Sequence, residues 1–274
     1  MSTRIETRMA TLKAAGRSGL IPFVTAGDPH PDWMADVLHA LVDGGADVLE
    51  LGMPFSDPMA DGPVIQKSSE RALARGMTLD RTLAIVRAFR ERDTTTPIVL
   101  MGYLNPVEYY GWERFAAQAK AAGVDGLLVV DCPPEEADSI RPVLAQHGLD
   151  QIFLASPTTT DARLAAMGEL AQGYVYYVSF AGITGADLLV MADVGAKLES
   201  LRRKIRVPIA VGFGVKTAEQ AAALAPQADA VVVGSALVEH LAAATSSADA
   251  AARARDFLQP LRRAMDAACT TETA

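Results

Sequence analysis

A regular alternation of short apolar segments with amphipathic helical segments is the feature that most constrains the fold. Apolar runs rich in β-branched residues begin roughly 22–34 residues apart, except for a gap of about 50 after the second run. Most of these runs are continuous, as is typical of parallel strands that are covered on both faces. The pattern predicts eight parallel strands, at Gly19–Thr25, Asp47–Leu51, Pro97–Met101, Asp125–Val130, Gln151–Ala155, Tyr174–Ser179, Pro208–Gly212 and Ala230–Gly234.

The segments between these runs carry apolar residues at helical spacing. In Asp32–Asp43, for example, Val37, Leu38 and Leu41 share one face, and Gly44 ends the helix. The same spacing predicts further helices at Thr78–Arg90, Trp112–Ala122, Glu135–His147, Asp161–Ala171, Ala192–Lys204, Thr217–Ala225 and Ala248–Ala267.

Strands that alternate with helices, without a linker between them, predict an α/β fold of the (β/α)8 TIM barrel type. Ile5, Met9 and Leu12 predict an extra N-terminal helix that plugs the bottom of this barrel. We expect residues 1–274 to form a single barrel domain. A doubly wound open sheet is the alternative, but it usually has fewer strands at this chain length.

Composition excludes several classes of function. Hydrophobic residues make up 50% of the chain and charged residues 21%, so a large core can be buried and intrinsic disorder is excluded. The net charge of −8 lacks the positive field that nucleic acids require. The sequence contains no charge-free apolar run that could cross a membrane and no signal-peptide pattern. Two cysteines form neither a disulfide framework nor a metal site, and no other spacing indicates a metal. We therefore expect a soluble, cytoplasmic protein.

Glu50 is the first candidate catalytic residue. The active sites of such barrels form at the C-terminal ends of the strands, and Glu50 interrupts an apolar run near the end of the second one. A buried carboxylate is costly unless it is paired or functional. The alternative is a structural carboxylate whose hydrogen bonds are made by neighbouring groups.

The loop that follows this strand, residues 53–63, contains two more carboxylates. Asp57 and Asp61 lie between three prolines and Gly62, in a loop that also carries apolar side chains. Long, stiff loops of this kind often carry function, although each aspartate alone is also typical of a turn. Glu50 and Asp61 together can divide acid and base roles on one ligand.

Glycines after the last two strands indicate a phosphate site. Gly212 and Gly214 follow the seventh strand, and Gly234-Ser235 follows the eighth. Barrels often bind phosphate here, where backbone N–H groups and helix N-termini meet the anion. The glycine-rich segment 180–185 after the sixth strand is expected to act as a lid.

Several of these motifs together resemble the tryptophan synthase alpha subunit family. The resemblance is carried by Leu49-Glu-Leu-Gly-Met-Pro-Phe-Ser-Asp-Pro-Met-Ala-Asp-Gly-Pro63, Pro22-Phe-Val-Thr-Ala-Gly-Asp-Pro29, Met101-Gly-Tyr-Leu-Asn-Pro106, Gly182-Ile-Thr-Gly185, Gly212-Phe-Gly214 and Gly234-Ser235. These matches cover nearly the whole chain and imply a (β/α)8 fold, in agreement with the strand pattern.

The resemblance implies a retro-aldol cleavage of indole-3-glycerol phosphate to indole and glyceraldehyde 3-phosphate. It implies that Glu50 is the general acid/base, that Asp61 holds the indole N–H, and that Tyr176 has an auxiliary role near the substrate. It also implies an indole pocket and a phosphate site. The pocket residues would be Phe23, Tyr103, Leu128 and Phe213, and the phosphate residues Gly185, Gly214, Gly234 and Ser235. Thr184, in the substrate site, would contact Asp61 and couple the lid to residues 53–63.

The same resemblance implies a partner, a beta subunit in an α2β2 assembly through which indole passes. Pyridoxal phosphate would belong to that partner, and this chain would carry no cofactor. The Asn105-Pro106 loop and the apolar Pro54-Phe55 region are candidates for the contacting face. One departure from the family pattern is Phe180, followed by an unusually apolar segment at residues 186–194, which affects the expected lid closure.

Two other functions remain open from the sequence. The first is another phosphate-binding barrel enzyme of indole or histidine biosynthesis, which would need a strand-borne lysine or an aspartate pair. This chain has Glu50 on the second strand instead, and Lys67 and Lys120 lie on helical segments. The second is a catalytically silent allosteric barrel, which would be marked by the loss of Glu50 or Asp61.

Overall fold

Eight parallel strands close into one barrel in the computed structural model, which describes residues 2–178, 189–212 and 214–271. Each strand pairs with its neighbour in sequence, and β8 pairs with β1 to close the ring. The strands are β1 Gly19–Thr25, β2 Leu49–Gly52, β3 Ile98–Gly102, β4 Gly126–Val129, β5 Asp150–Ala155, β6 Val175–Val178, β7 Ile209–Gly212 and β8 Ala230–Val233. The predicted strands are confirmed to within two residues at their ends, and the open sheet is excluded.

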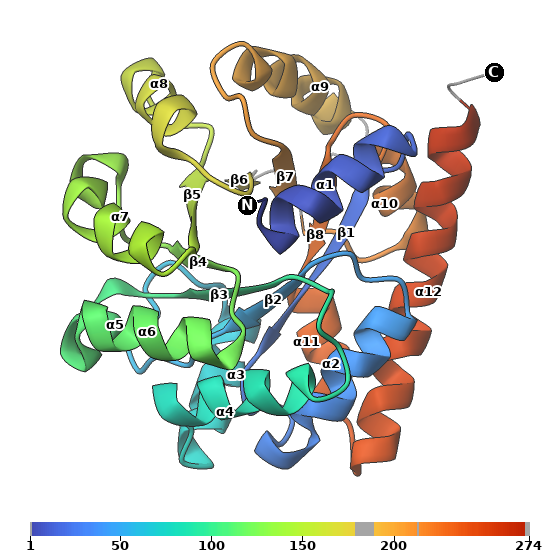
Figure 1. The fold of residues 1–274 in the computed structure, drawn as a ribbon. Coiled ribbons are helices and arrows are strands. Elements are labelled where there is room, and N and C mark those ends of the chain that lie inside the picture. The colour runs from blue at the N-terminus through green and yellow to red at the C-terminus, as the bar shows by residue number, and fades with distance from the viewer. Residues whose placement is uncertain (1, 179–188, 213, 272–274) are drawn as a thin grey trace.

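Helices surround the barrel on its outside (Figure 1). They are α1 Arg4–Ala14, α2 Met34–Asp43, α3 Pro63–Ala74, α4 Leu79–Arg90, α5 Leu104–Tyr110, α6 Trp112–Ala122, α7 Ala137–Gln146, α8 Asp161–Leu170, α9 Leu189–Arg202, α10 Ala218–Leu224, α11 Ser235–Leu241 and α12 Ser247–Thr271, with short 3-10 turns at Pro31–Trp33 and Pro134–Glu136. The predicted helices are all present, although two of them begin with the 3-10 turns.

Three helices were not expected from the sequence. α3 fills part of the long gap between β2 and β3, and α11 begins directly after the glycine that follows β8. The expected loop at Asn105-Pro106 is wrong, because both residues belong to α5. Pro106 stands in the first turn of this helix, where its missing N–H costs no intrahelical hydrogen bond.

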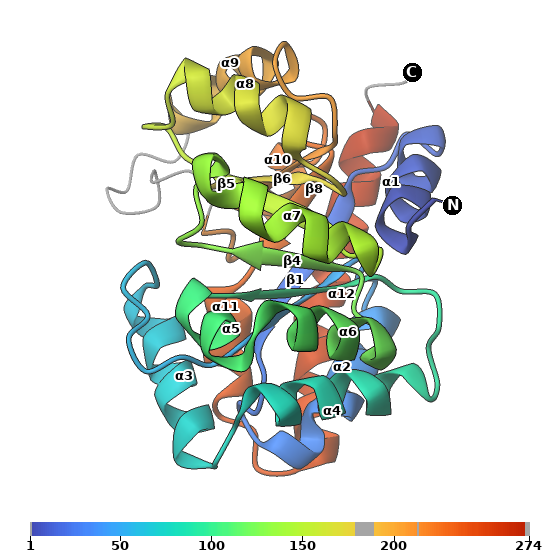
Figure 2. The same cartoon turned by 60° about the vertical axis from the view of Figure 1, so that its left-hand side comes forward.

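The barrel interior is closed at one end by α1, as predicted. Ile5, Met9 and Leu12 of this helix are buried in the same cluster as the inward-facing side chains of the strands. Figure 2 shows α1 at the end of the barrel where the strands begin. Thr3 caps the helix by accepting from the Glu6 N–H, and it donates to Asp150 at 2.8 Å.

Carboxylates reinforce this N-terminal end of the barrel. Asp47, Asp125 and Asp229 each precede a strand, and each accepts a backbone N–H from the neighbouring strand at 2.8–3.0 Å. Each of them also lies within 4 Å of an arginine from the outer helices. These contacts connect neighbouring strands and outer helices at the N-terminal end of the barrel.

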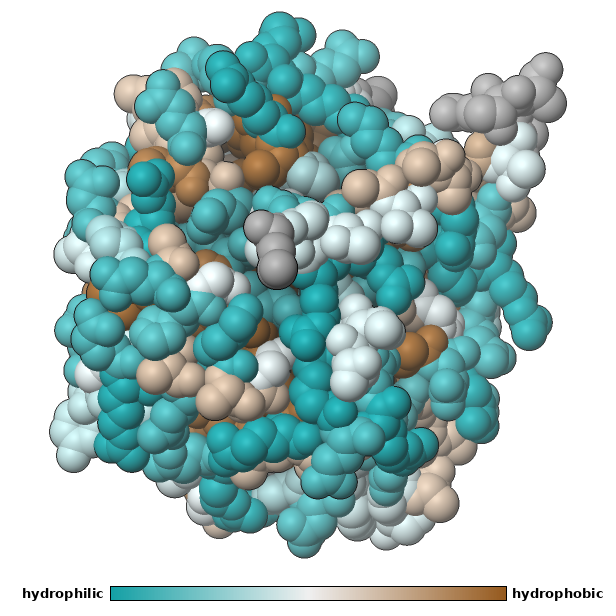
Figure 3. Space-filling model, in the orientation of Figure 1, coloured by the Kyte–Doolittle hydropathy of each residue, from teal (hydrophilic) through white to brown (hydrophobic). Residues whose placement is uncertain are grey.

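The surface at the N-terminal end is mainly hydrophilic, with hydrophobic residues between the polar ones (Figure 3). Two large hydrophobic residues elsewhere on the surface are exposed: Met59, in the loop between β2 and α3, is 82% exposed, and Tyr109, on α5, is 95% exposed. In the part of the chain that the structure describes, no helix is both long and apolar enough to cross a membrane.

Candidate active site

Glu50 lies in the middle of β2 and points into the barrel, where it is fully buried. Its Oε1 atom accepts a hydrogen bond from the Tyr174 hydroxyl at 2.6 Å. Its other oxygen, Oε2, is buried and bonds no group in the described part of the chain. Burial raises the pKa of Glu50 to about 7, and the bond from Tyr174 only partly opposes this rise. The carboxyl can therefore give or take a proton near neutral pH.

Two tyrosines face Glu50: Tyr174, which directly precedes β6, and Tyr176, the second residue of this strand. Sequence reasoning missed Tyr174, although it stands two residues before Tyr176 and strand periodicity places both on one face. Tyr176 also points into the barrel, as its part in the interior cluster shows, whereas Tyr177 packs outward against the helices. Burial and the charge of Glu50 raise the pKa of Tyr176, so its hydroxyl stays protonated.

The absence of a side chain at Gly212 makes room for Tyr176. A Cβ atom at this position of β7 would lie only 2.1 Å from the Tyr176 hydroxyl oxygen. Gly52 on β2 has the same role for Phe23, because its Cβ would lie 2.5 Å from the Phe23 ring. These two glycines are therefore required by close approach of aromatic rings.

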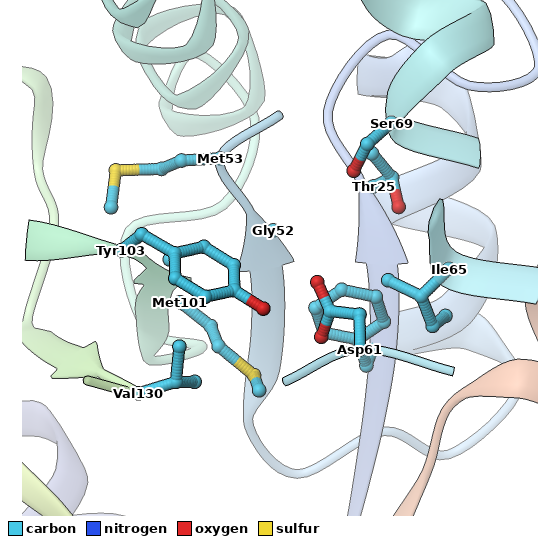
Figure 4. A pocket seen from close by; sticks show the side chains of 11 residues that line it. Thr25, Gly52, Met53, Asp61, Ile65, Ser69, Met101, Tyr103 and Val130 are labelled. Carbon is cyan, nitrogen blue, oxygen red and sulfur yellow. The ribbon is translucent and has the colours of Figure 1, made fainter. Parts of the chain in front are cut away.

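Asp61 is half-buried in the loop between β2 and α3. Figure 4 shows the Tyr103 hydroxyl pointing toward the Asp61 carboxylate from across a small pocket. Burial raises the pKa of Asp61, and the Tyr103 hydroxyl partly offsets this. The Tyr103 oxygen also accepts the Ala60 N–H at 3.0 Å, and burial raises the pKa of Tyr103 to about 12. The pair is thus held together by both backbone and side-chain contacts.

The pocket beside Asp61 is narrow in this structure. It is lined by residues of β1, β2, β3, α3 and the segments that follow the strands: Phe23, Thr25, Gly52, Met53, Asp61, Ile65, Ser69, Met101, Gly102, Tyr103 and Val130. Its volume is about 10 Å³, which holds about one water molecule. The Thr25 hydroxyl is buried and bonds no described group, so it is available to a ligand.

Two of the four residues predicted to form the indole pocket lie together in the structure. Phe23 and Tyr103 line the pocket with Asp61. Leu128 lies in the barrel interior but does not line this pocket. Phe213 lies outside the described residues. Thr25, Ile65, Ser69 and Met101 were missed by sequence reasoning. A signal existed for Thr25, which follows Phe23 by two residues on the same strand face.

Three of the predicted phosphate residues, Gly214, Gly234 and Ser235, follow β7 and β8. Gly214 has a φ of +63°, a conformation that glycine adopts readily. Gly234 precedes α11 and Ser235 is its first residue, so their N–H groups lie at a helix N-terminus. Gly185, Thr184 and the departure at Phe180 lie outside the described residues.

Asp57 is not part of the site. It is exposed, and it accepts a hydrogen bond from Ser56 at 2.6 Å, as a turn residue does. Among the residues that the structure describes, no group of three histidine, cysteine or acidic side chains is placed to hold a metal ion.

Comparisons with known proteins agree with the fold and with the sequence motifs. The profile of the tryptophan synthase alpha chain family matches residues 9–266. The chain is 59% identical over 264 residues to the tryptophan synthase alpha chain of Laribacter hongkongensis, covering 96% of this chain and 99% of the relative. It is 55% identical over 266 residues to that of Burkholderia thailandensis, covering 97% and 98%.

Solved structures give the same result. The crystal structure of tryptophan synthase subunit alpha from Legionella pneumophila matches with a TM-score of 0.91 at 45% identity, covering 97% of this chain and 100% of that one. A crystal structure of tryptophan synthase from M. tuberculosis matches with a TM-score of 0.85 at 34% identity, covering 96% and 100%. By sequence and by fold, the chain belongs to the tryptophan synthase alpha chain family.

Proposed function

We propose that this chain cleaves indole-3-glycerol phosphate through Glu50 and Asp61. Membership of the family makes it the alpha subunit of a lyase of tryptophan biosynthesis. The observation that carries the assignment of residues is the fully buried Glu50 carboxyl, whose pKa of about 7 suits proton transfer in both directions.

The reaction breaks the bond between indole C3 and the adjacent carbon of the glycerol chain. Protonated Glu50 donates its proton to indole C3, which leaves a cationic ring and a Glu50 carboxylate. The carboxylate then takes the proton of the hydroxyl on the glycerol carbon that is bonded to indole C3. As that C–O bond becomes a carbonyl, the C–C bond breaks and its electron pair returns to the ring. Indole and glyceraldehyde 3-phosphate leave, and Glu50 is protonated again.

Asp61 stabilises the positive charge that the ring carries between these steps. A carboxylate that accepts the indole N–H lowers the energy of the cation more than that of the neutral substrate, which is the requirement for catalysis. Tyr103 supports this role because its hydroxyl remains protonated and keeps the Asp61 carboxylate oriented. Tyr176 is assigned an auxiliary role, as a neutral hydroxyl beside Glu50.

The pocket must widen before it can hold an indole ring, because its volume of about 10 Å³ is far below that of the ligand. Met53 and Met101 line it, and methionine side chains change rotamer easily. Glu50 must also turn from Tyr174 toward the substrate. The proposal thus requires two side-chain movements, a widening of the pocket and a rotation of Glu50.

The phosphate group is assigned to the loops after β6, β7 and β8. Gly185, Gly214, Gly234 and Ser235 would bind it, largely through backbone N–H groups, and the N-terminus of α11 favours the dianion. Phe23, Leu128 and Phe213 would contact the ring, and Thr184 would contact Asp61 when segment 180–185 closes.

Family membership also implies a beta-subunit partner. We assign this chain to an α2β2 assembly in the cytoplasm, with pyridoxal phosphate held by the beta subunit and no cofactor in this chain. Residues 1–274 would then act as one barrel domain. The exposed Met59 and Tyr109 support a contact face formed by residues 53–62 and α5.

The test is indole release from indole-3-glycerol phosphate by the purified chain, alone and with a beta subunit. Slow release that rises sharply with the partner is expected. Glu50→Gln and Asp61→Asn are each expected to abolish release while the far-UV circular dichroism and glycerol 3-phosphate binding stay intact. A variant with wild-type turnover would refute the role given to that residue. No release by the wild type in either state, with phosphate still bound, would favour a silent or different barrel.

A further inference from the structure

α3 forms one wall of the Asp61 pocket but has few apolar contacts to hold it there. Its buried residues are small: Ser68, Ser69 and Ala72. Ile65 and Ser69 of this helix line the pocket. Small side chains bury little apolar surface and stabilise packing weakly. The position of α3 must therefore depend on other contacts.

Those contacts converge on one buried carboxylate, Asp28, in the segment that follows β1. The Asp28 side chain is only 2% exposed. Arg71 donates two hydrogen bonds to it, at 2.8 Å and 2.7 Å, and Ser68 donates a third at 2.9 Å. Arg75 lies 3.7 Å from the same group. These three partners are spaced by three and four residues, so they form one stripe of α3 that faces the barrel.

A second set of bonds connects the same helix to Asp61. The Gln66 side chain donates to the Asp61 carbonyl oxygen at 2.8 Å and lies 3.5 Å from the Pro58 carbonyl oxygen. Both bonds leave the first turn of α3 and end in the loop that carries Asp61. Any shift of the helix therefore shifts the loop, because Gln66 bonds its backbone directly.

We propose that Asp28 is a positioning residue for the cleavage reaction, which acts on Asp61 through α3 and Gln66. Asp28 is buried three residues after the end of β1, whereas Asp61 is only half-buried in a longer loop, so Asp28 can fix the loop carboxylate relative to Glu50 on β2. This inference rests on the proposed function. Misplacement of a catalytic group by about 1 Å can cost about 100-fold in rate.

The first test is Asp28→Asn, which keeps the shape of the side chain and removes its charge. The Arg71 side chain is 35% exposed and can turn to water, so the barrel is expected to fold. We expect kcat for indole release to fall about 10- to 100-fold, while the inhibition constant of glycerol 3-phosphate changes less than twofold. A kcat within twofold of the wild type would overturn the proposal.

Asp125→Asn is the matched control. Asp125 is also buried and also bonds two arginines, Arg90 and Arg4, but it lies at the opposite end of the barrel. It is expected to lower the melting temperature and to leave kcat within twofold, when each variant is assayed well below its melting temperature. An equal loss of kcat in this control would mean that general destabilisation explains the effect, and the proposal would fail.

A double-mutant cycle tests the route through the helix. Gln66→Ala is expected to lower kcat on its own, and adding Asp28→Asn is expected to lower it by much less than the product of the two single effects. Multiplicative effects would show that Asp28 does not act through Gln66 and would overturn the route.

Hydrogen exchange separates this inference from the proposed function. In Asp28→Asn, amides of residues 58–66 are expected to exchange faster than in the wild type, whether or not the wild type releases indole. Unchanged exchange in this segment would refute the positioning role by itself. If the wild type releases no indole but exchange is faster in Asp28→Asn, the proposed function is refuted and the link from Asp28 to the Asp61 loop still holds.

Discussion

At the residue scale, the chemistry depends on the surroundings of one carboxyl group. Glu50 is fully buried, and Tyr174 is its single hydrogen-bond donor in the described part of the chain. No arginine or lysine contributes to its pKa, which burial raises to about 7. The proposed acid role of Glu50 at neutral pH therefore rests on burial without a charged partner, in contrast to the arginine-paired aspartates at the N-terminal end of the barrel.

Removing the Tyr174 hydroxyl is expected to shift the pH profile of the reaction. The hydrogen bond favours the charged form of Glu50 and lowers its pKa, so Tyr174→Phe raises that pKa further. Because the cycle starts from protonated Glu50, the alkaline fall of kcat/KM moves to higher pH. Tyr177→Phe, on the outer face of the same strand, is the control. An unchanged alkaline limb in Tyr174→Phe would contradict this account.

Glu50 also makes folding stability depend on pH. Its pKa rises from 4.5 in the unfolded chain to about 7 in the folded one, so between these values the folded state binds more protons. The stabilisation of the folded state by protonated Glu50 is therefore complete below pH 4.5, and it is lost as the pH rises through 7. At about 1.4 kcal/mol per pKa unit, the loss is on the order of 3 kcal/mol.

Glu50→Gln is expected to remove this loss. Relative to the wild type, the variant gains free energy of unfolding between pH 5 and pH 8, as measured by urea denaturation at each pH. Asp57→Asn, at an exposed carboxylate in the loop after β2, is the control substitution. A difference between Glu50→Gln and wild type that does not grow with pH would be evidence against a buried, neutral Glu50.

At the scale of elements, long apolar faces made several helices predictable, although α8 and α10 were also predicted with only two buried residues each. α2, α4 and α6 each bury four or more residues on one side, and their ranges follow from spacing alone. α3 buries serines and alanine, and α5 and α11 have seven residues each. In short or weakly amphipathic helices the apolar residues show only a weak helical period, which makes these helices hard to predict. Packing against the barrel supplies most of their stability.

The plug helix α1 provides a test of element stability. Thr3 caps it and donates to Asp150, whose pKa burial raises to about 6. Thr3→Val removes both bonds and is expected to cost about 1 kcal/mol through the cap alone. The loss is expected to be larger at pH 8 than at pH 5, because the ionised Asp150 then lacks its donor. Thermal melts at both pH values measure this.

The plug is also expected to be separate from catalysis. Turnover of Thr3→Val, measured well below its melting temperature, is expected to match the wild type, since Thr3 and Asp150 lie at the N-terminal end of the barrel. Thr3→Ser, which keeps a hydroxyl for both bonds, is the control for the cap. Equal melting losses at the two pH values would argue against the Thr3–Asp150 bond as the cause.

At the scale of the whole molecule, the two ends of the barrel differ in what their carboxylates contact. Asp47, Asp125 and Asp229 bond strand amides at the N-terminal end, whereas Asp61, one of the two proposed catalytic carboxylates, lies in the loop after β2 at the other end. The large exposed hydrophobic residues, Met59 and Tyr109, lie on the loop after β2 and on α5, which follow strands at the active end. The proposed active site and the proposed partner contact therefore both lie at the C-terminal end of the barrel.

Tyr109→Glu is expected to weaken binding of the beta subunit. Tyr109 is 95% exposed, so the substitution changes no internal packing, but it places a charge in an apolar contact face. Titration of beta subunit against indole release is expected to require at least tenfold more partner, with the activity of the chain alone unchanged. Glu91→Gln, on the exposed C-terminal end of α4, is the control. Unchanged partner affinity would exclude Tyr109 from the interface.

The sequence by itself determined the barrel, its plug helix and the segments in which the proposed site residues lie. Continuous β-branched runs and helical periods are local patterns, and the rules that join them into a closed parallel barrel leave few alternatives. Glu50 and Asp61 could be selected because carboxylates are unexpected in a buried strand and in a stiff, partly apolar loop.

Only the tertiary structure decided which groups meet across the barrel. Tyr174 is 124 residues from Glu50, and Arg71 reaches Asp28 over 43 residues. The pKa of Glu50 depends on the combined burial by all eight strands, and the narrow pocket depends on the rotamers of side chains from several of them. These quantities are set by distances in space between segments that are remote along the chain, and no local pattern encodes such distances.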